Sequence, residues 1–377
     1  MAHFNTVLSQ IVQFFPRHEF NALAKKFHSG QKFRMFSRWT QFVVMLAAQL
    51  TQRCSLRDVV DSFGVQRSKL YHFGIRPFSR ATLARCNEKQ SCDLFEELFK
   101  RLLGRCQGIA PRNKTFKLGG KIYLLDASLV ALSLSLFPWA QYQKSKGAAK
   151  LHVGLDADGY LPAFLNLTEG KEHEIKLARK LKFPPGSYVV IDRGYTDYDW
   201  YHELTENGIF FVARLKTNAQ IVLGRRRRGR KSPGVLEDRE IRLGNLPDAY
   251  RLVTYLDKET GITYQFVTNA LDLPAQTVAD LYKERWQIEL FFKWIKQNLK
   301  VKSFLGTSMN AVKTQLWIAL CAYLLLSYIK FQAKLGHSLQ RILRILQLNL
   351  FERRDLWELF KPPENKNPFQ TSQLQLI

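Results

Sequence analysis

The first third of the chain carries apolar residues at the three- and four-residue spacing of amphipathic helices. This spacing is clear in residues 42–50 and again in residues 94–102. A helix with apolar residues along one face buries that face against other helices, because its opposite face remains polar. The pattern therefore predicts an all-helical N-terminal domain over residues 1–115.

Two short helical segments within this domain follow each other closely. Ser55 is a suitable N-cap for the first segment, and Gly64 is a suitable residue to end it. The second segment covers residues 66–71, and the arrangement resembles a helix-turn-helix, so we expect the domain to contact DNA. A small helical bundle with no such role shows the same pattern. The basic residues nearby are Arg67, Lys69, Arg76, Arg80 and Arg85.

Beyond Gly119 the apolar positions change to short runs that are typical of buried strands. An Asp-Ala-Asp-Gly turn joins two of these runs into a hairpin. The runs cover residues 121–126, 150–156, 160–167, 187–192 and 209–215, and helical segments cover residues 172–181 and 199–206. The order β, β, β, α, β, α, β predicts an α/β fold with a mixed sheet, which fits a ribonuclease H-like core.

Residues 217–268 interrupt this alternation with further short runs of β-type residues. We interpret them as a β-rich insertion within a catalytic domain that spans residues 116–335. The insertion contains a basic cluster, for which we expect contact with the DNA backbone; a solvated loop is the alternative. The cluster consists of Arg225, Arg226, Arg227, Arg228, Arg230 and Lys231.

The remaining part of the chain is predicted to be helical. Residues 273–300 form one long predicted helix, with Pro274 in its first turn. The uncharged run at residues 316–329 is shorter than the ~20 apolar residues that span a bilayer, so we expect a buried helix. Residues 336–377 are expected to form a basic helical tail that is loosely held from residue 362 onward.

The charge balance of the chain indicates the kind of partner that it binds. The 377 residues include 57 Lys and Arg against 32 Asp and Glu, which gives a formal net charge of +25. Such a surplus favours a polyanionic partner, with DNA first and an anionic membrane surface as the alternative. The 5 cysteines include no CxxC pair. We therefore expect neither a zinc site nor a disulfide framework, and a reduced, cytoplasmic location.

Three acidic residues are candidates for metal-assisted chemistry on a phosphodiester. Asp126 and Asp192 each end a predicted strand, and ligands gather at strand ends in an open α/β sheet. Carboxylates that converge there hold the two cations, about 3.5–4 Å apart, that such chemistry uses. The third candidate, Glu289, lies on the long helix, on a face shared with Tyr282, Arg285, Lys293 and Lys296. A solvent-facing stripe of Glu and Lys has similar spacing and is the alternative.

The same helix carries a specific signature. It reads Y-x2-R-x3-E-x6-K, with Tyr282, Arg285, Glu289 and Lys296 at the four fixed positions. Together with the segments around Asp126 and Asp192, this signature resembles the insertion sequence four family of DDE transposases. Residues 80–89 are also similar to the helical N-terminal region of that family. The likeness covers nearly the whole chain, and a small departure is Ala127 after the first aspartate.

The resemblance implies an enzyme that cuts and rejoins DNA. Asp126, Asp192 and Glu289 would bind two Mg2+ or Mn2+ ions. Water would cut at the ends of an insertion sequence to free a 3′ hydroxyl, and that hydroxyl would attack target DNA by direct transesterification. Two cut ends have to be joined, so the resemblance also implies a homodimer in a synaptic complex. The location that follows is the bacterial cytoplasm, in association with the nucleoid.

The resemblance also implies which side chains contact DNA. Arg and Lys neutralise phosphates near the scissile bond, and Tyr282 or Trp286 would stack a displaced base. The expected contacts on the helix are Tyr282, Arg285, Trp286, Lys293 and Lys296, joined by Arg193 after the second aspartate.

Other readings remain open at this point. One is a catalytically silent DNA-binding protein descended from a transposase, and another is a ribonuclease H-fold nuclease or resolvase. Asp156 and Asp158 are interpreted as turn formers because of the Asp-Gly step. Glu172, His173 and Glu174 lack the histidine spacing of a zinc protease and are interpreted as a helix start.

Overall fold

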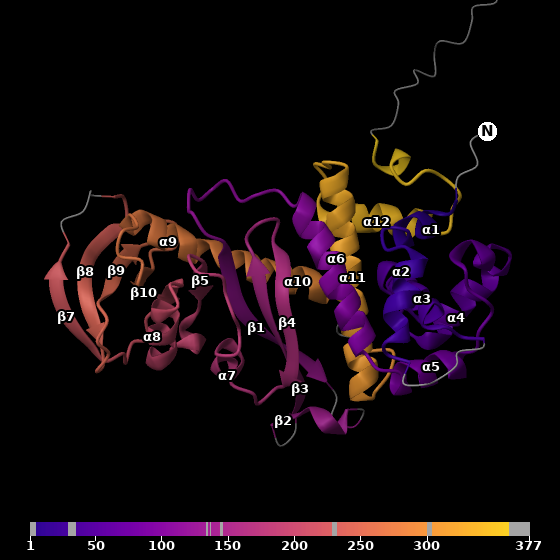
Figure 1. Cartoon of the computed structure of the whole chain (residues 1–377), viewed down its shortest axis with the longest axis horizontal. Coiled ribbons are helices and arrows are strands. Elements are labelled where there is room, and N and C mark those ends of the chain that lie inside the picture. Colours follow the sequence, from indigo (N-terminus) through magenta and orange to yellow (C-terminus); the bar gives the residue numbers. More distant parts are fainter. Residues whose placement is uncertain are drawn as a thin grey trace, which may run out of the picture.

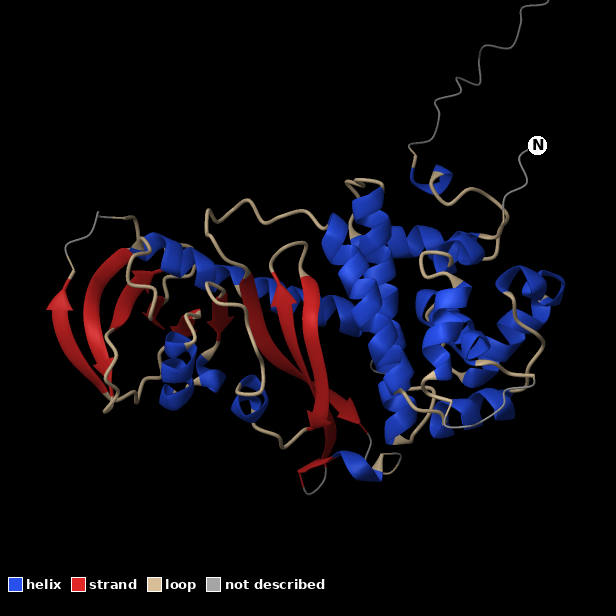
Figure 2. Cartoon of the chain, in the orientation of Figure 1, coloured by secondary structure: helices blue, strands red, loops and turns tan. Residues whose placement is uncertain are grey.

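The computed structural model describes residues 5–28, 35–132, 135, 137–143, 146–227, 232–299 and 304–361. Helices gather at one end of the molecule, and a long twisted sheet extends from them toward the other end (Figures 1 and 2). The long helix α11 and helix α6 lie side by side where the two parts meet (Figure 1).

The N-terminal part is helical, as predicted. Its α4 starts where the sequence indicates, because the Ser55 hydroxyl accepts from the Asp58 amide at 3.1 Å and the Asp58 carboxylate accepts from the Ser55 amide at 3.1 Å. The elements are α1 (Val7–Val12), α2 (Arg17–Lys25), α3 (Arg38–Leu50), α4 (Leu56–Val65), η1 (Arg67–Phe73), α5 (Arg80–Lys89) and α6 (Asp93–Ile109).

The expected helix-turn-helix is not formed. α4 continues through Gly64 to Val65, and the 3-10 helix η1 begins after the single residue Gln66. A helix-turn-helix needs a turn of three or four residues and a second α-helix that enters the major groove. In η1, Leu70 and Phe73 are instead buried in the helical core.

The core sheet is mixed and has the strand order of a ribonuclease H-like fold, as predicted. β1 pairs antiparallel with β3 and parallel with β5, and β5 pairs parallel with β6. The strands are β1 (Ile122–Leu132), β2 (Gln141–Gln143), β3 (Lys146–Asp156), β4 (Leu161–Glu169), β5 (Tyr188–Ile191) and β6 (Phe210–Arg214). Between them lie η2 (Pro138–Ala140), α7 (Glu174–Ala178), η3 (Arg193–Tyr195) and α8 (Tyr198–Glu206).

The inserted strands extend this sheet. β10 (Thr263–Thr268) pairs antiparallel with β6, and β9, β8 and β7 follow outward. The described residues thus form one sheet of ten strands. The outer strands are β7 (Ile221–Arg226), β8 (Val235–Leu243) and β9 (Tyr250–Leu256). Within this extension the buried guanidinium of Arg251 bonds both oxygens of Asp238 at 2.8 and 2.7 Å.

The single helix expected over residues 273–300 is two helices. α9 (Ala275–Glu284) and α10 (Trp286–Asn298) meet at Arg285, where the backbone forms hydrogen bonds between residues three apart, as in a 3-10 helix. The Arg285 amide donates to the Tyr282 carbonyl at 3.1 Å, and the Ile288 amide donates to the Arg285 carbonyl at 3.1 Å.

The apolar run at residues 316–329 belongs to α11 (Met309–Gln332), which is buried as predicted. This helix is long and apolar enough to cross a membrane, but 89% of its most apolar stretch is buried within the protein. α12 (Leu339–Asn349) also buries one face, and η4 (Glu358–Phe360) follows it. The Leu8 amide donates to the Leu350 carbonyl at 2.9 Å, so the C-terminal segment packs on α1. The predicted loose tail from residue 362 lies outside the described residues.

Candidate active site

Asp126 lies inside strand β1 and not at its end, contrary to our prediction. The strand continues to Leu132, because β3 pairs with it along its whole length. The parallel partner β5, however, pairs only with residues 122–124. Asp126 therefore lies just beyond the end of β5, at the carboxyl edge of the parallel pair.

Asp192 follows β5 directly, as predicted, and lies at the same edge. Its Oδ1 accepts a hydrogen bond from the Gly194 amide at 2.8 Å and caps the short helix η3. The parallel register of β1 and β5 brings Asp192 close enough to Asp126 for its charge to raise the pKa of the Asp126 carboxyl.

Glu289 reaches the site from the first turn of α10, through its neighbour Arg285. The Arg285 guanidinium donates to Glu289 Oε1 at 2.5 Å and lies 3.4 Å from Asp126 Oδ2. One cation thus joins a carboxylate of the sheet to a carboxylate of the helix. The Arg285 and Asp126 side chains are only 15% and 18% exposed, so this contact is poorly screened by solvent.

Burial and neighbouring charges perturb the pKa of the Asp126 carboxyl. Burial above all, with smaller contributions from the charges of Asp192 and Glu174, raises its pKa to about 7. Arg285 and the hydrogen bond from the Ala127 amide oppose this rise, but they do not outweigh it. A carboxyl in this state gains from any additional cation that approaches the sheet edge.

The donor set has the chemistry of a site for a hard divalent cation, which prefers carboxylate oxygens. Arg285 already places one positive charge between two of the acids. Among the described residues, however, no group of three or more Asp, Glu, His or Cys side chains is close enough to hold a metal ion.

Two of the residues expected to contact DNA, Tyr282 and Lys296, are half-buried and contact other parts of the fold. Tyr282 packs on Phe266, with ring centroids 4.6 Å apart, and the Arg285 guanidinium lies over its ring. Lys296 Nζ bonds Ser128 Oγ at 2.5 Å and the Leu129 carbonyl at 2.9 Å, so it ties α10 to β1. These two side chains support the site from within the fold.

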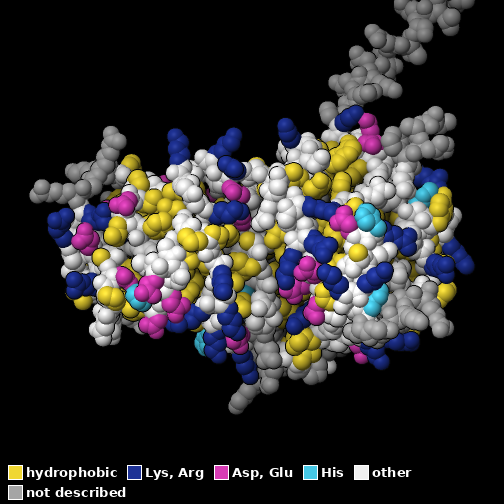
Figure 3. Space-filling view, viewed as in Figure 1, with side chains coloured by type: hydrophobic (Ala, Val, Ile, Leu, Met, Phe, Trp, Pro, Cys, Tyr) yellow, Lys and Arg dark blue, Asp and Glu magenta, His cyan; other side chains and the backbone are white. Residues whose placement is uncertain are grey.

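The other expected contacts lie at the surface. Trp286 is 58% exposed, Arg193, Lys293, Arg225 and Arg226 are exposed, and Arg227 is half-buried. Arg228, Arg230 and Lys231 lie outside the described residues. Lys and Arg side chains are distributed across the face shown in Figure 3, so the positive charge does not form a single stripe there.

Glu174 is a fourth acidic residue near the site, and the sequence pattern indicated only a helix start. It opens α7, and its Oε1 lies 3.4 Å from Lys150 Nζ. A Cβ built on Gly194 would lie 2.7 Å from Glu174 Oε2 and 2.9 Å from Asp192 Oδ1. Glycine at position 194 therefore leaves room for both carboxylates. The only sequence signal was Gly194, two residues after Asp192, and its role could not be inferred without the position of α7.

The sequence containing the three acids matches a model of a known protein family. The model of the transposase DDE domain matches residues 117–325, a range that contains Asp126, Asp192 and Glu289. The chain belongs to the DDE transposase family. This DDE transposase acts on DNA, and as in its family the chemistry depends on divalent metal. Phosphodiester cleavage at insertion-sequence ends and transfer of the strands to target DNA are accordingly its activity.

Proteins with sequences similar to this DDE transposase are also transposases. It is 34% identical over 293 residues to the y4zB transposase of Sinorhizobium fredii, covering 74% of this chain and 80% of the relative. It is 29% identical to the transposase of insertion sequence element IS5377 from Geobacillus stearothermophilus, covering 70% of each chain. A similar solved structure is a piggyBac transposase synaptic complex with hairpin DNA, with a TM-score of 0.48, 12% identity, and coverage of 96% of this chain and 83% of that one. Residues 3–76 match a domain of unknown function.

Proposed function

We propose that Asp126, Asp192 and Glu289 are the catalytic carboxylates of this transposase and hold two Mg2+ or Mn2+ ions. The observation that carries the proposal is the position of Arg285, whose guanidinium lies between Asp126 and Glu289. A cation is therefore already favoured at the point where the acids of the sheet and of α10 meet. The strand order supports the same assignment, because it places Asp126 and Asp192 at one edge.

When bound, the metal ions activate the attacking oxygen and stabilise the leaving oxygen of the phosphodiester. The side chains of the chain do the remaining work. Asp126, Asp192 and Glu289 would hold these ions from three elements of the fold, β1, the end of β5 and α10. Arg285 turns from the carboxylates to a phosphate oxygen of the substrate, for which its planar guanidinium is suited. Tyr282 and Lys296 hold α9 and α10 against the sheet.

The DNA contacts beyond the acids are proposed from exposure and charge. Trp286 offers an exposed ring on which a displaced base stacks, and Lys293 and Arg193 neutralise nearby phosphates. The basic cluster of the insertion contacts the backbone farther from the cut. Glu174 completes the negative field at the sheet edge, with Lys150 fixing its position.

The organisation of the chain is proposed as follows. Residues 1–115 form a DNA-binding domain, residues 116–335 form the catalytic domain with the insertion at 217–268, and residues 336–377 form a helical tail. The contact between α1 and the segment after α12 supports a tail that packs on the first domain. A homodimer bridges two transposon ends, and the protein acts in the bacterial cytoplasm at the nucleoid.

The test is cleavage of a labelled duplex that carries the ends of the element, taken from the flanks of its gene. We expect Mg2+-dependent cutting at the end by the wild type and no cutting by Glu289→Gln, with DNA binding retained. Glu259→Gln is the matched control, because Glu259 is 79% exposed and, among the described residues, its carboxylate forms an ion pair only with the exposed Lys283. Calorimetric titration of the DNA-free protein with Mn2+ should show weaker binding for Glu289→Gln and no change for Glu259→Gln.

Two results would overturn the assignment. Cutting at the wild-type rate by Glu289→Gln would remove Glu289 from the catalytic set. Binding without cutting by the wild type, under both Mg2+ and Mn2+, would favour the silent DNA-binding alternative.

A further inference from the structure

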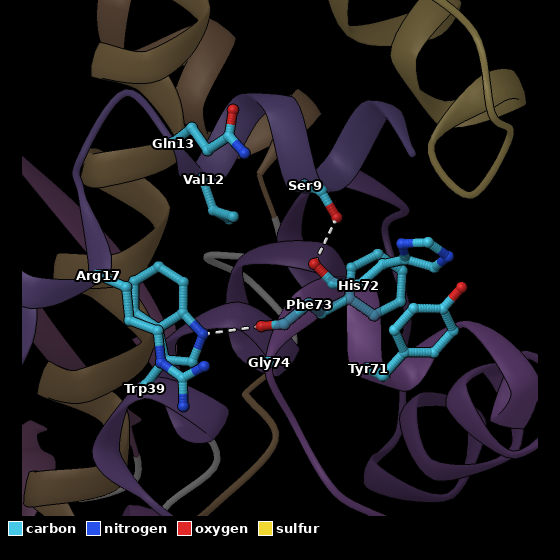
Figure 4. A pocket seen from close by; sticks show the side chains of 9 residues that line it. All are labelled: Ser9, Val12, Gln13, Arg17, Trp39, Tyr71, His72, Phe73 and Gly74. Atoms are coloured by element: carbon cyan, nitrogen blue, oxygen red, sulfur yellow. Dashed lines mark hydrogen bonds between the residues drawn. The ribbon is translucent and has the colours of Figure 1, made fainter. Parts of the chain in front are cut away.

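A small hollow in the N-terminal helical part lies outside the candidate active site. It has a volume of about 200 Å3 and lies between α1, the start of α2, Trp39 of α3 and the end of η1 (Figure 4). Arg17 and Trp39 form one side in this view, and Tyr71 and His72 form the other. The lining residues are Ser9, Val12, Gln13, Arg17, Trp39, Tyr71, His72, Phe73 and Gly74.

Most polar groups of this hollow are already used within the fold. The Trp39 indole donates to the Phe73 carbonyl at 2.8 Å, and the Ser9 hydroxyl donates to the His72 carbonyl at 2.9 Å (Figure 4). These bonds hold η1 against α1 and α3. Arg17 differs, because its guanidinium lies 5.9 Å from the centre of the Trp39 ring and faces the solvent-accessible side. It forms no ion pair with any of the described residues.

The close approach of Arg17 to η1 depends on a glycine. Gly74 ends η1 with a φ of +65°, a left-handed conformation that favours glycine. A Cβ at this position would lie 2.1 Å from a terminal nitrogen of Arg17. The absence of a side chain at residue 74 therefore permits the guanidinium to lie at the rim of the hollow.

The other rim combines a second cation with an aromatic stack. The rings of Tyr71 and His72 lie 3.8 Å apart, and Tyr71 is 67% exposed. Arg353, from the segment after α12, donates to His72 Nε2 at 2.6 Å and to the Tyr71 hydroxyl at 3.1 Å. Lys69 bonds the Phe351 carbonyl at 3.0 Å. Neither Arg353 nor Lys69 forms an ion pair with a carboxylate in the part of the chain that the structure describes.

The surroundings of the hollow disfavour a cationic ligand. None of its nine lining residues is acidic, and the sequence has no Asp or Glu between Asp61 and Glu88. Burial and the charges of Arg353 and Lys69 lower the pKa of His72, which shows how positive the rim is. An anion is the ligand that gains most from this field.

The size and shape of the hollow favour a polymer over a free small molecule. Its volume is below the ~300–1,000 Å3 of sites that enclose a small ligand. Guanidinium groups bind phosphate oxygens in a planar, bidentate manner, and the phosphates that repeat along a nucleic-acid backbone meet a cation at each rim, Arg17 at one and Arg353 at the other. An exposed tyrosine beside a cationic groove is the arrangement on which unpaired or terminal bases stack.

We propose that this hollow is a binding site for the DNA backbone, in which Arg17 and Arg353 contact phosphates from opposite rims and Tyr71 stacks on an adjacent base or sugar. The site gives a function to the domain that residues 3–76 match. It rests on the DNA partner of the transposase but not on the assignment of the catalytic acids.

The test measures DNA binding by the full chain in EDTA, so that metal binding and cleavage play no part. A fluorescent duplex of the element's end is titrated by anisotropy at several salt concentrations. Arg17→Gln and Arg353→Gln are each expected to lower the affinity about 3- to 10-fold and to reduce the slope of log K against log salt by about 1. Tyr71→Ala is expected to lower the affinity at least ~5-fold with little change in slope.

The matched control is Lys100→Gln, which removes the same charge from the helical part. Lys100 lies on α6, is 59% exposed and is already paired with Glu96 at 2.9 Å, so we expect no change in affinity or slope. Because backbone contacts carry no sequence information, an unrelated duplex should show the same losses. Arg17→Lys keeps the charge and should restore the slope but not the full affinity.

The proposal is overturned if Arg17→Gln and Arg353→Gln bind DNA as Lys100→Gln does while all variants unfold at the wild-type temperature. If the Arg17 and Arg353 variants bind weakly but Glu289→Gln still cuts, the backbone site stands and the catalytic assignment fails. The two proposals are therefore distinguished by separate measurements.

Discussion

The buried ion pair between Arg251 and Asp238 gives the sharpest prediction about stability. Arg251 is 3% exposed, and its guanidinium bonds both Asp238 oxygens as well as the Leu271 and Leu273 carbonyls. Leu273 lies just before α9, so this one side chain joins the inserted strands to the helices that carry Glu289. The substitution Arg251→Met removes the cation and leaves the 12% exposed Asp238 side chain without its partner.

The magnitude follows from the burial. Removing one partner of a buried ion pair costs roughly 3–5 kcal/mol, because the other charge remains buried without compensation. In the same insertion, on the neighbouring pair of strands β7 and β8, Arg226 is 79% exposed and lies 3.7 Å from Glu237. Arg226→Gln should therefore cost at most about 1 kcal/mol, the value of an exposed pair.

The assay is urea unfolding of the wild type, the two single variants Arg251→Met and Asp238→Leu, and their double variant. We expect the double variant to be more stable than the sum of the single losses predicts, with a coupling of at least about 2 kcal/mol. Arg226→Gln is measured beside them. A coupling below about 1 kcal/mol, or equal losses for Arg251→Met and Arg226→Gln, would refute the reasoning from burial.

Three further predictions concern the site and the N-terminal helices. Because the pKa of Asp126 is raised, the folded protein holds a proton there that the unfolded chain has released. The free energy of unfolding of the metal-free protein should therefore fall as the pH rises from 4 to 7. Asp126→Asn should reduce this fall, measured by urea unfolding at pH 5 and pH 8. Glu174→Gln removes one of the charges that raise this pKa, so the apparent pKa of Asp126, followed by NMR, should fall, whereas an unchanged value would place Glu174 outside the field of the site. Ser55→Ala removes half of the capping box at α4 and should cost about 1 kcal/mol in thermal unfolding, while no loss would show that the cap has no effect on stability.

The sequence by itself determined the features that depend on local spacing. The capping residue Ser55, the buried apolar helix α11 and the mixed α/β core were all predictable, because periodicity and caps act within a few residues. The three acids were candidates from the same local patterns and from the Y-x2-R-x3-E-x6-K signature. Their position relative to one another did not follow from the pattern.

Only the tertiary structure decided which distant residues meet. The extension of the core sheet through β10, the packing of the C-terminal segment on α1 and the approach of Glu174 to Gly194 all join segments far apart in the sequence. Local periodicity carries no information about such contacts, because they are selected by how whole faces fit together. Arg285 shows the difference most clearly. Its spacing predicted a side chain on the same helix face as Glu289, whereas the fold adds Asp126 of β1 as a second partner, and the low exposure of both side chains makes this opposite charge favourable.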